Sequence, residues 1–303
     1  FIDKKDKPLK VYAQLEIAVG IFALILPLIL NNLFPVYELV YQALGSGSTV
    51  GITVIQVAIA FVCLLVPTIA MGATLPVLGA VVSSQASRFG SNISLLYGVN
   101  TLGAVVGTLA SGFFLIGVFG EWATVIIGVS VNLLVGLMAY YYSNMHEGNT
   151  APSIEPSDVQ SSSDEGRVSP YPSYVRYVVV SVFMVSGFVA LGYEIVWTRL
   201  LQIFTGPSIY AFTLMLGVYL SGIAIGSIGI SRVIDRFKEP LLAFGILELI
   251  LSFLGVIGLF WFQSVAEMAI DSYSLRMLLP TLLVVLPPTI ILGLIFPTVT
   301  KCY

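Results

Sequence analysis

Residues 51–82 read GITVIQVAIAFVCLLVPTIAMGATLPVLGAVV and contain no charged side chain. A bilayer-crossing helix needs about 20 mostly apolar residues, so this run predicts a span long enough to tilt or to extend past the membrane. Similar apolar runs lie at roughly 11–30, 93–117, 122–142, 175–203, 208–231, 241–262 and 277–300. They are far longer than the ~10-residue strands of a membrane barrel. The expected fold class is therefore an all-α polytopic membrane bundle of about eight spans.

The composition excludes most other classes. The chain of 303 residues is 57% hydrophobic and only 10% charged, whereas soluble domains are about 45–50% apolar and about 25% charged. A soluble globular domain, a disordered chain and a nucleic-acid binder are excluded, and the lipid bilayer is the expected partner. With 2 Cys and 1 His, the chain has no disulfide framework or metal-ligand spacing. No catalytic, cofactor or metal site is expected.

The basic residues predict the orientation of the spans. If residues 1–10 are cytoplasmic, nearly all Lys and Arg residues in the loops fall on the same side, as the positive-inside rule requires. That side carries Lys4, Lys5, Lys7, Lys10, Arg88, Arg167, Arg176, Arg232, Arg236, Lys238 and Lys301. Only Arg276 falls on the other side, and Arg199 lies in or near a span. This bias supports eight spans with residues 1–10 in the cytoplasm.

A polar segment divides the spans into two groups of four. Residues 143–173 are rich in Ser, Pro, Asp and Glu and cannot bury enough apolar surface to order themselves. We expect a disordered cytoplasmic linker there, acting as a tether or as a phosphorylated or partner-binding loop. Residues 1–142 and 174–303 are then parts of a first and a second repeat.

An internal repeat supports this division. Residues 2–16, IDKKDKPLKVYAQLE, match 234–248, IDRFKEPLLAFGILE, and PTIAMGATLP (67–76) matches PTIILGLIFP (288–297). Spans seven and eight thus repeat spans one and two with a period of six helices. Because an even period keeps the orientation, the repeats are parallel, as are the two halves of major-facilitator-type transporters. This predicts twelve helices in the whole protein, two before Phe1 and two after Tyr303.

The repeat also singles out paired helix-breaking residues. Pro67, Gly72 and Pro76 in the first copy correspond to Pro288, Gly293 and Pro297 in the second. Proline removes a helical hydrogen bond and kinks the helix. Helix breaks at matched repeat positions point to a central transporter site, although simple structural kinks would give the same pattern.

A few ionisable residues lie within the expected spans, where charges are costly and often functional. Glu194 and Arg199 share span five, and a spacing of five residues directs them to different faces of the helix. Glu16 and Glu248 are repeat-related, which favours either a bond to a neighbouring helix in each half or a cation site.

Three more residues are candidates for gating or packing. Asp235 and Arg236, in SRVIDRFKEP (231–240), partly match the major-facilitator loop signature. Asp235 is expected either to cap a neighbouring helix or to pair with Arg232 or Arg236. Asn100 is more typical of interhelical hydrogen bonding than of ligand binding. Small-residue faces at 103–107 and 222–226 predict close helix packing.

Several stretches resemble one family. They are YEIVWTRLLQIFTGPSIYAFTLMLGVYLSGIAIGS (193–227), DRFKEP (235–240), PTIAMGATLPVL (67–78) and YGVNTLGAVVGTLASGFFLIGVFG (97–120). Together they are similar to the membrane domain of bacterial fused major-facilitator/spermidine-synthase-like proteins. The resemblance implies a multi-pass protein of the bacterial inner membrane. It also implies a soluble aminopropyltransferase-like domain after the helices, although no catalytic motif of that domain occurs here.

Three functions follow as alternatives. The chain is a domain that transports or senses a small organic cation, with Glu194, Glu16 and Glu248 supplying negative charge. Alternatively, it is a membrane anchor for an aminopropyltransferase-like domain outside this chain, or a structural subunit of a larger membrane complex with protein partners.

Overall fold

The computed structural model describes residues 8–44, 49–82, 89–145, 171–268 and 278–302, and these contain helices and no strand. They fall into two compact units. Unit 1 comprises residues 1–81 and 119–154, and unit 2 comprises 82–118 and 155–303, as far as they are described. Most of the expected linker, residues 146–170, lies outside the described residues, as do residues 1–7.

The spans are those that the sequence predicts. Among the described residues, seven helical segments are long and apolar enough to cross a membrane. One of them, Gly90–Met145, has 56 residues and would be about 84 Å long as a straight helix, against a hydrocarbon core of about 30 Å. It is interrupted at Gly120, whose φ of 81° and ψ of 175° are not helical. This segment therefore supplies two of the eight predicted spans, and an all-α polytopic membrane bundle is confirmed.

Unit 1 contains α1 (Pro8–Asn31), α2 (Phe34–Leu44), α3 (Thr49–Val82) and most of α5 (Ile116–Met145). The first and last of these pack in antiparallel register, because Gly20 lies against Leu133 while Gly136 lies against Ala13 and Ile17. The Lys10 ammonium lies 5.4 Å from the Tyr140 ring centre, a cation–π contact. The short helix α2, between spans one and two, was not predicted from the sequence.

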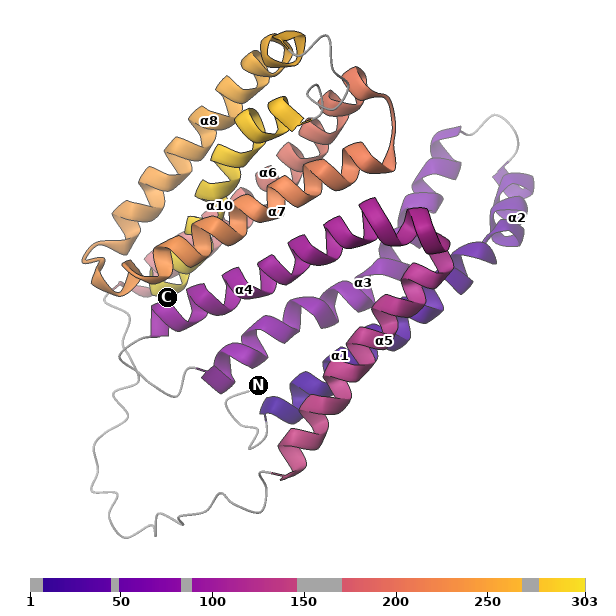
Figure 1. The fold of residues 1–303 in the computed structure, drawn as a ribbon, viewed down its shortest axis with the longest axis horizontal. Helices are drawn as coiled ribbons and strands as arrows, with labels where there is room; N and C mark the ends of the chain where they lie inside the picture. Colours follow the sequence, from indigo (N-terminus) through magenta and orange to yellow (C-terminus); the bar gives the residue numbers. More distant parts are fainter. Residues whose placement is uncertain (1–7, 45–48, 83–88, 146–170, 269–277, 303) are drawn as a thin grey trace. The chain divides into compact units, whose positions relative to one another are not determined.

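Unit 2 is built around α7 (Ile209–Ser231), which packs against α4 (Phe89–Ala110) and α10 (Leu286–Cys302) (Figure 1). The contacts with α4 follow an antiparallel register along its whole length. The Ser227 hydroxyl donates a 2.7 Å bond to the Ser94 carbonyl. Further along the same contact, Gly98 lies against Ile228, and the π-helical turn η2 (Ser111–Leu115) places Gly112 against Thr213.

The contact between α7 and α10 depends on three glycines. A Cβ at Gly293 would lie 2.8 Å from the Cα of Ile223, and one at Gly226 would lie 3.1 Å from the Cα of Gly293. Gly222 lies against Thr289. These small residues allow the two backbones to touch, as the 222–226 stripe predicts. The 103–107 stripe differs, because a Cβ at Gly103 or Gly107 would meet nothing within 4 Å in the described part of unit 2.

The remaining helices of unit 2 complete its core. They are α6 (Ser173–Thr205) and α8 (Pro240–Met268), with the short 3-10 turn η4 (Ile234–Arg236) before α8 and the π-helical turn η5 (Thr281–Val285) before α10. One buried cluster gathers residues of α6, α7, α8 and η5 around Trp197, and a second joins α6, α8 and α10 around Ile295.

Candidate functional site

An aromatic cluster with one carboxylate lies inside unit 2. Trp197 of α6 is fully buried and stacks on Tyr193, with ring centres 5.2 Å apart and planes 11° apart. The Trp197 ring also lies near that of Tyr219 of α7, with ring centres 6.4 Å apart and planes tilted by 59°. The Tyr219 hydroxyl donates a long, 3.4 Å bond to the Ala190 carbonyl. Two helices thus place three aromatic rings in contact.

Glu194 belongs to this cluster. It follows Tyr193 on α6, is half-buried, and lies close enough to Tyr219 for a direct electrostatic interaction. Its carboxylate accepts no hydrogen bond from a described residue. A carboxylate among aromatic rings and without a bonded donor is suited to a cation, since ring faces attract cations as carboxylates do.

Three further helices shape the cluster. Tyr97 of α4 packs against the same core and lies 4.6 Å, centre to centre, from the Phe296 ring of α10. Gly255 of α8 makes room for the phenol of Tyr193, because a Cβ there would lie 2.9 Å from the Tyr193 Cε1 atom and closer still to the end of the ring. The cluster therefore draws on four helices besides α7.

Besides the Glu194 carboxylate, a buried donor of the cluster has no partner in the part of the chain that the structure describes. The Trp197 indole N–H is buried and donates to no acceptor among the described residues. A buried donor without a partner costs about 1–3 kcal/mol.

Arg199 lies apart from Glu194. It is exposed on α6, whereas Glu194 is half-buried. This agrees with a five-residue spacing, which turns the two side chains to different faces. The structure does not bring the two charges together as a pair.

The repeat-related acids have different surroundings. Glu248 of α8 interacts with the hydroxyl of Ser186 on α6, while its Oε1 atom is buried without a partner. Glu16 of α1 takes a hydrogen bond from Tyr12, four residues earlier on the same helix. Only Glu248 therefore bonds a neighbouring helix, and neither acid belongs to the aromatic cluster.

Asp235 caps a helix. Its Oδ2 atom accepts a 3.3 Å bond from the Ser91 backbone N–H in the first turn of α4, where a negative charge is favourable. Of the two contacts expected for Asp235, the structure shows the cap. Arg236 and Asn100 are both exposed, so the expected interhelical hydrogen bond of Asn100 is not seen in the described part of unit 2.

The matched prolines lie within helices. Neither Pro67 nor Pro76 ends α3, and Pro297 does not end α10. The structure therefore does not show the expected breaks. Each proline removes one backbone hydrogen bond from its helix, and the hydroxyls of Thr68 and Thr298 donate to the neighbouring carbonyls of Leu64 and Leu294.

No protein-family model, curated protein or solved structure matches the chain. The resemblance to the spermidine-synthase-like family therefore stays a prediction that rests on the quoted motifs.

The aromatic residues near Glu194 were not predicted from the sequence. Tyr97 and Tyr219 both lie in quoted motifs, but only the folded chain brings them together.

Proposed function

We propose that this membrane-embedded domain binds a small organic cation at Glu194, as part of a spermidine-synthase-like protein of the bacterial inner membrane. The observation that carries the proposal is the position of Glu194. Its half-buried carboxylate accepts no hydrogen bond from a described residue and lies within electrostatic reach of Tyr219, beside the stacked pair of Tyr193 and Trp197.

The chemistry favours an alkylammonium ligand. A carboxylate pairs with the ammonium group, and ring faces attract the same charge, more strongly when water is excluded. The alkyl stem of such a ligand suits the apolar residues of the surrounding core, among them Leu201, Met215 and Val218. An inorganic cation would instead need several oxygen ligands, and Glu194 is the one carboxylate of this cluster.

Binding is tested with the purified chain in lipid nanodiscs. Trp122 and Trp261 are exposed, so replacing both with Phe leaves Trp197 as the sole fluorophore of the 3 Trp residues. We expect putrescine or spermidine to change the Trp197 emission saturably. Glu194→Gln should weaken binding about tenfold to a hundredfold, because a hydrogen bond to a charged group contributes about 1.5–3 kcal/mol.

The matched control is Glu121→Gln. Glu121 is exposed in unit 1, so its loss should leave the affinity unchanged. Equal loss in both variants would indicate non-specific attraction of a polycation. Absence of any saturable change would overturn the proposal and favour the membrane-anchor alternative.

A second candidate function is a subunit of a larger membrane assembly. It is favoured by α3, whose most apolar window is 0% buried in the structure and whose repeat counterpart α10 is packed against α7 and α8. The test is the size of the particle extracted from membranes in mild detergent. A particle larger than one chain, with α3 cross-linked to another protein, supports this function, and a monomer surrounded by lipid contradicts it.

A further inference from the structure

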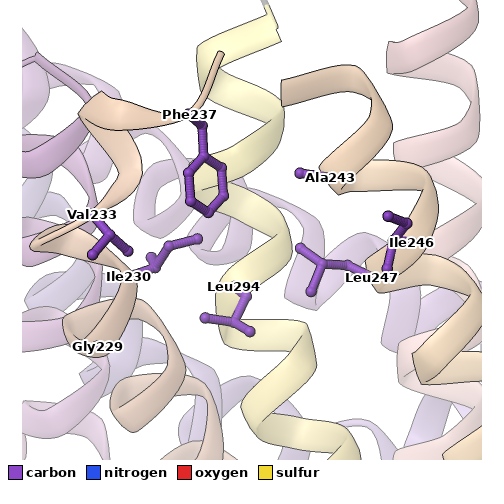
Figure 2. A pocket seen from close by; sticks show the side chains of 8 residues that line it. All are labelled: Gly229, Ile230, Val233, Phe237, Ala243, Ile246, Leu247 and Leu294. Atoms are coloured by element: carbon purple, nitrogen blue, oxygen red, sulfur yellow. The ribbon is translucent and has the colours of Figure 1, made fainter. Parts of the chain in front are cut away.

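An apolar pocket lies at one end of unit 2, away from Glu194. Its volume is about 440 Å³, within the range of about 300–1,000 Å³ that is typical of small-molecule sites. Figure 2 shows side chains from three directions around it. The lining residues are Gly229, Ile230, Val233, Phe237, Ala243, Ile246, Leu247 and Leu294.

The pocket is formed by the ends of two spans, where they would reach the membrane–water interface. The end of α7 forms one wall, the beginning of α8 forms the other, and Leu294 of α10 closes the back (Figure 2). Val233 and Ile246 are 42% and 48% exposed, so apolar surface continues from the pocket to the outside of the unit. No polar side chain lines it, which excludes a polar metabolite and suits a hydrocarbon chain.

The loop at the mouth of the pocket is held in place by its own bonds. The Lys301 ammonium donates to the carbonyls of Ile234, at 2.6 Å, and Phe237, at 3.0 Å. Asp235 is bonded to the first turn of α4. This fixes Phe237, whose ring hangs over the pocket between α7 and α8 in Figure 2. The pocket is therefore a built feature of the fold.

The same loop carries an excess of positive charge. Arg232, Arg236 and Lys238 are exposed and lie within one residue of the lining residues Val233 and Phe237. The acids of the loop are Asp235, which is bonded to α4, and Glu239, which is exposed. Helix α8 also begins here at Pro240, and a helix N-terminus favours anions. The mouth thus suits an anion, while the interior suits hydrocarbon.

We propose that this pocket binds one anionic phospholipid, with an acyl chain among the apolar residues and the phosphate at Arg232, Arg236 and Lys238. Basic pockets between membrane helices on the cytoplasmic side are typical sites for anionic headgroups. The basic residues place this loop on the cytoplasmic side by the positive-inside rule. The lipid therefore comes from the inner leaflet.

Native mass spectrometry of the delipidated full chain tests the site. The probes are phosphatidylglycerol and phosphatidylcholine with identical palmitoyl and oleoyl chains. We expect one phosphatidylglycerol to be retained more tightly than phosphatidylcholine. Each basic residue near an anionic surface is worth about fivefold in affinity, so the triple variant Arg232→Gln, Arg236→Gln, Lys238→Gln should lose at least about tenfold for phosphatidylglycerol and little for phosphatidylcholine.

A pocket-filling variant tests the acyl-chain part. Ala243→Phe should reduce retention of both lipids, and its control is Ala58→Phe, on the exposed part of α3. Equal retention of the two lipids by the unaltered chain, or equal effects of the two Phe variants, would overturn the proposal. Retention of a second protein chain in place of lipid would also overturn it.

Labelling gives a readout that does not depend on variants. Phosphatidylglycerol with a photoreactive group at the end of its acyl chain should label Ile246, Leu247 or Leu294 in the unaltered protein. Labels spread evenly over exposed apolar residues such as Phe253 and Phe260 would show ordinary boundary lipid. Because no step involves Glu194, failure here leaves the cation-binding proposal untouched.

Discussion

The two segments matched by the predicted repeat, 67–76 and 288–297, share five of ten residues and lie in different environments. Around Pro288, Gly293 and Pro297 of α10 the chain is buried against α7. Gly72 and Pro76 of α3 are themselves exposed, although Val77 beside them is buried, and a Cβ at Gly72 would meet nothing within 4 Å in the described part of unit 1. A motif can therefore persist in sequence while its packing partner is present in only one of the two units.

The local structure, in contrast, is the same in both copies. The Thr289 hydroxyl bonds the carbonyls of Val285 and Leu286 at 3.0 and 2.9 Å. Thr68, its repeat partner, bonds those of Leu64 and Leu65 at 2.8 and 3.0 Å. What differs is burial, since Thr289 is 0% exposed and Thr68 is exposed. The repeat thus provides matched pairs in which packing alone changes.

The largest effect is expected from the glycines. In Gly293→Leu the new side chain would collide with the backbone of Ile223, and backbone atoms cannot move aside as a flexible side chain can. We expect a loss of about 3 kcal/mol or more, seen as reduced monodisperse protein and a lower Tm in detergent. Gly72→Leu should change stability by less than about 0.5 kcal/mol.

An equal loss of stability in Gly293→Leu and Gly72→Leu would contradict the difference in packing between α10 and α3. A large loss for Gly72→Leu would mean that the face of α3 at Gly72 is covered in the membrane, as the assembly hypothesis requires. Measuring both variants in native membranes and in detergent shows whether a protein partner covers α3 at Gly72. Detergent removes a protein partner more readily than it disrupts an intramolecular contact, so the effect of Gly72→Leu would then be smaller in detergent.

A smaller effect is expected from the threonines. Thr289→Ala removes a buried side chain that fills the space beside Gly222, which should cost about 1 kcal/mol. Thr68→Ala loses the same intrahelical bonds and leaves no cavity, so it reports the effect of those bonds alone. The difference between the two Tm shifts measures the packing contribution, and no difference would contradict the α7–α10 contact.

The sequence predicts the positions of the helices better than it predicts which helices pack against each other. Long uncharged runs depend only on local composition, so the apolar helices lie near the predicted positions, with Gly90–Met145 covering two of the predicted spans. Residues 103–107 and 222–226 carry similar small-residue stripes, yet only Gly222 and Gly226 contact another helix in their own unit. A stripe shows that a close approach is sterically feasible, and the choice of partner depends on tertiary structure.

At the candidate site, too, the sequence predicts a single residue but not the residues that surround it. Glu194 was predicted because an acid within a span is costly, and this depends on one residue and its flanks. Its neighbour Tyr219 comes from another helix 25 residues later and has no helical spacing to reveal it. The sequence also cannot predict that the Trp197 N–H lacks a partner among the described residues, because the burial of one atom depends on the whole core.

The smallest effects are expected from the repeat-related acids Glu248 and Glu16, and the changes in stability are expected to have opposite signs. Glu248 has a buried oxygen without a partner, whereas Glu16 is bonded by Tyr12. Glu248→Gln removes a poorly solvated negative charge, so we expect stability to rise by up to about 1 kcal/mol. Glu16→Gln weakens a charge-assisted bond and should lower stability by about 0.5 kcal/mol. Thermal unfolding of both variants in the same detergent gives the two signs. If Glu248→Gln is instead the more damaging change, a favourable partner stabilises the charge of Glu248 in the native protein, either the Ser186 hydroxyl or a cation, and Ser186→Ala separates the two.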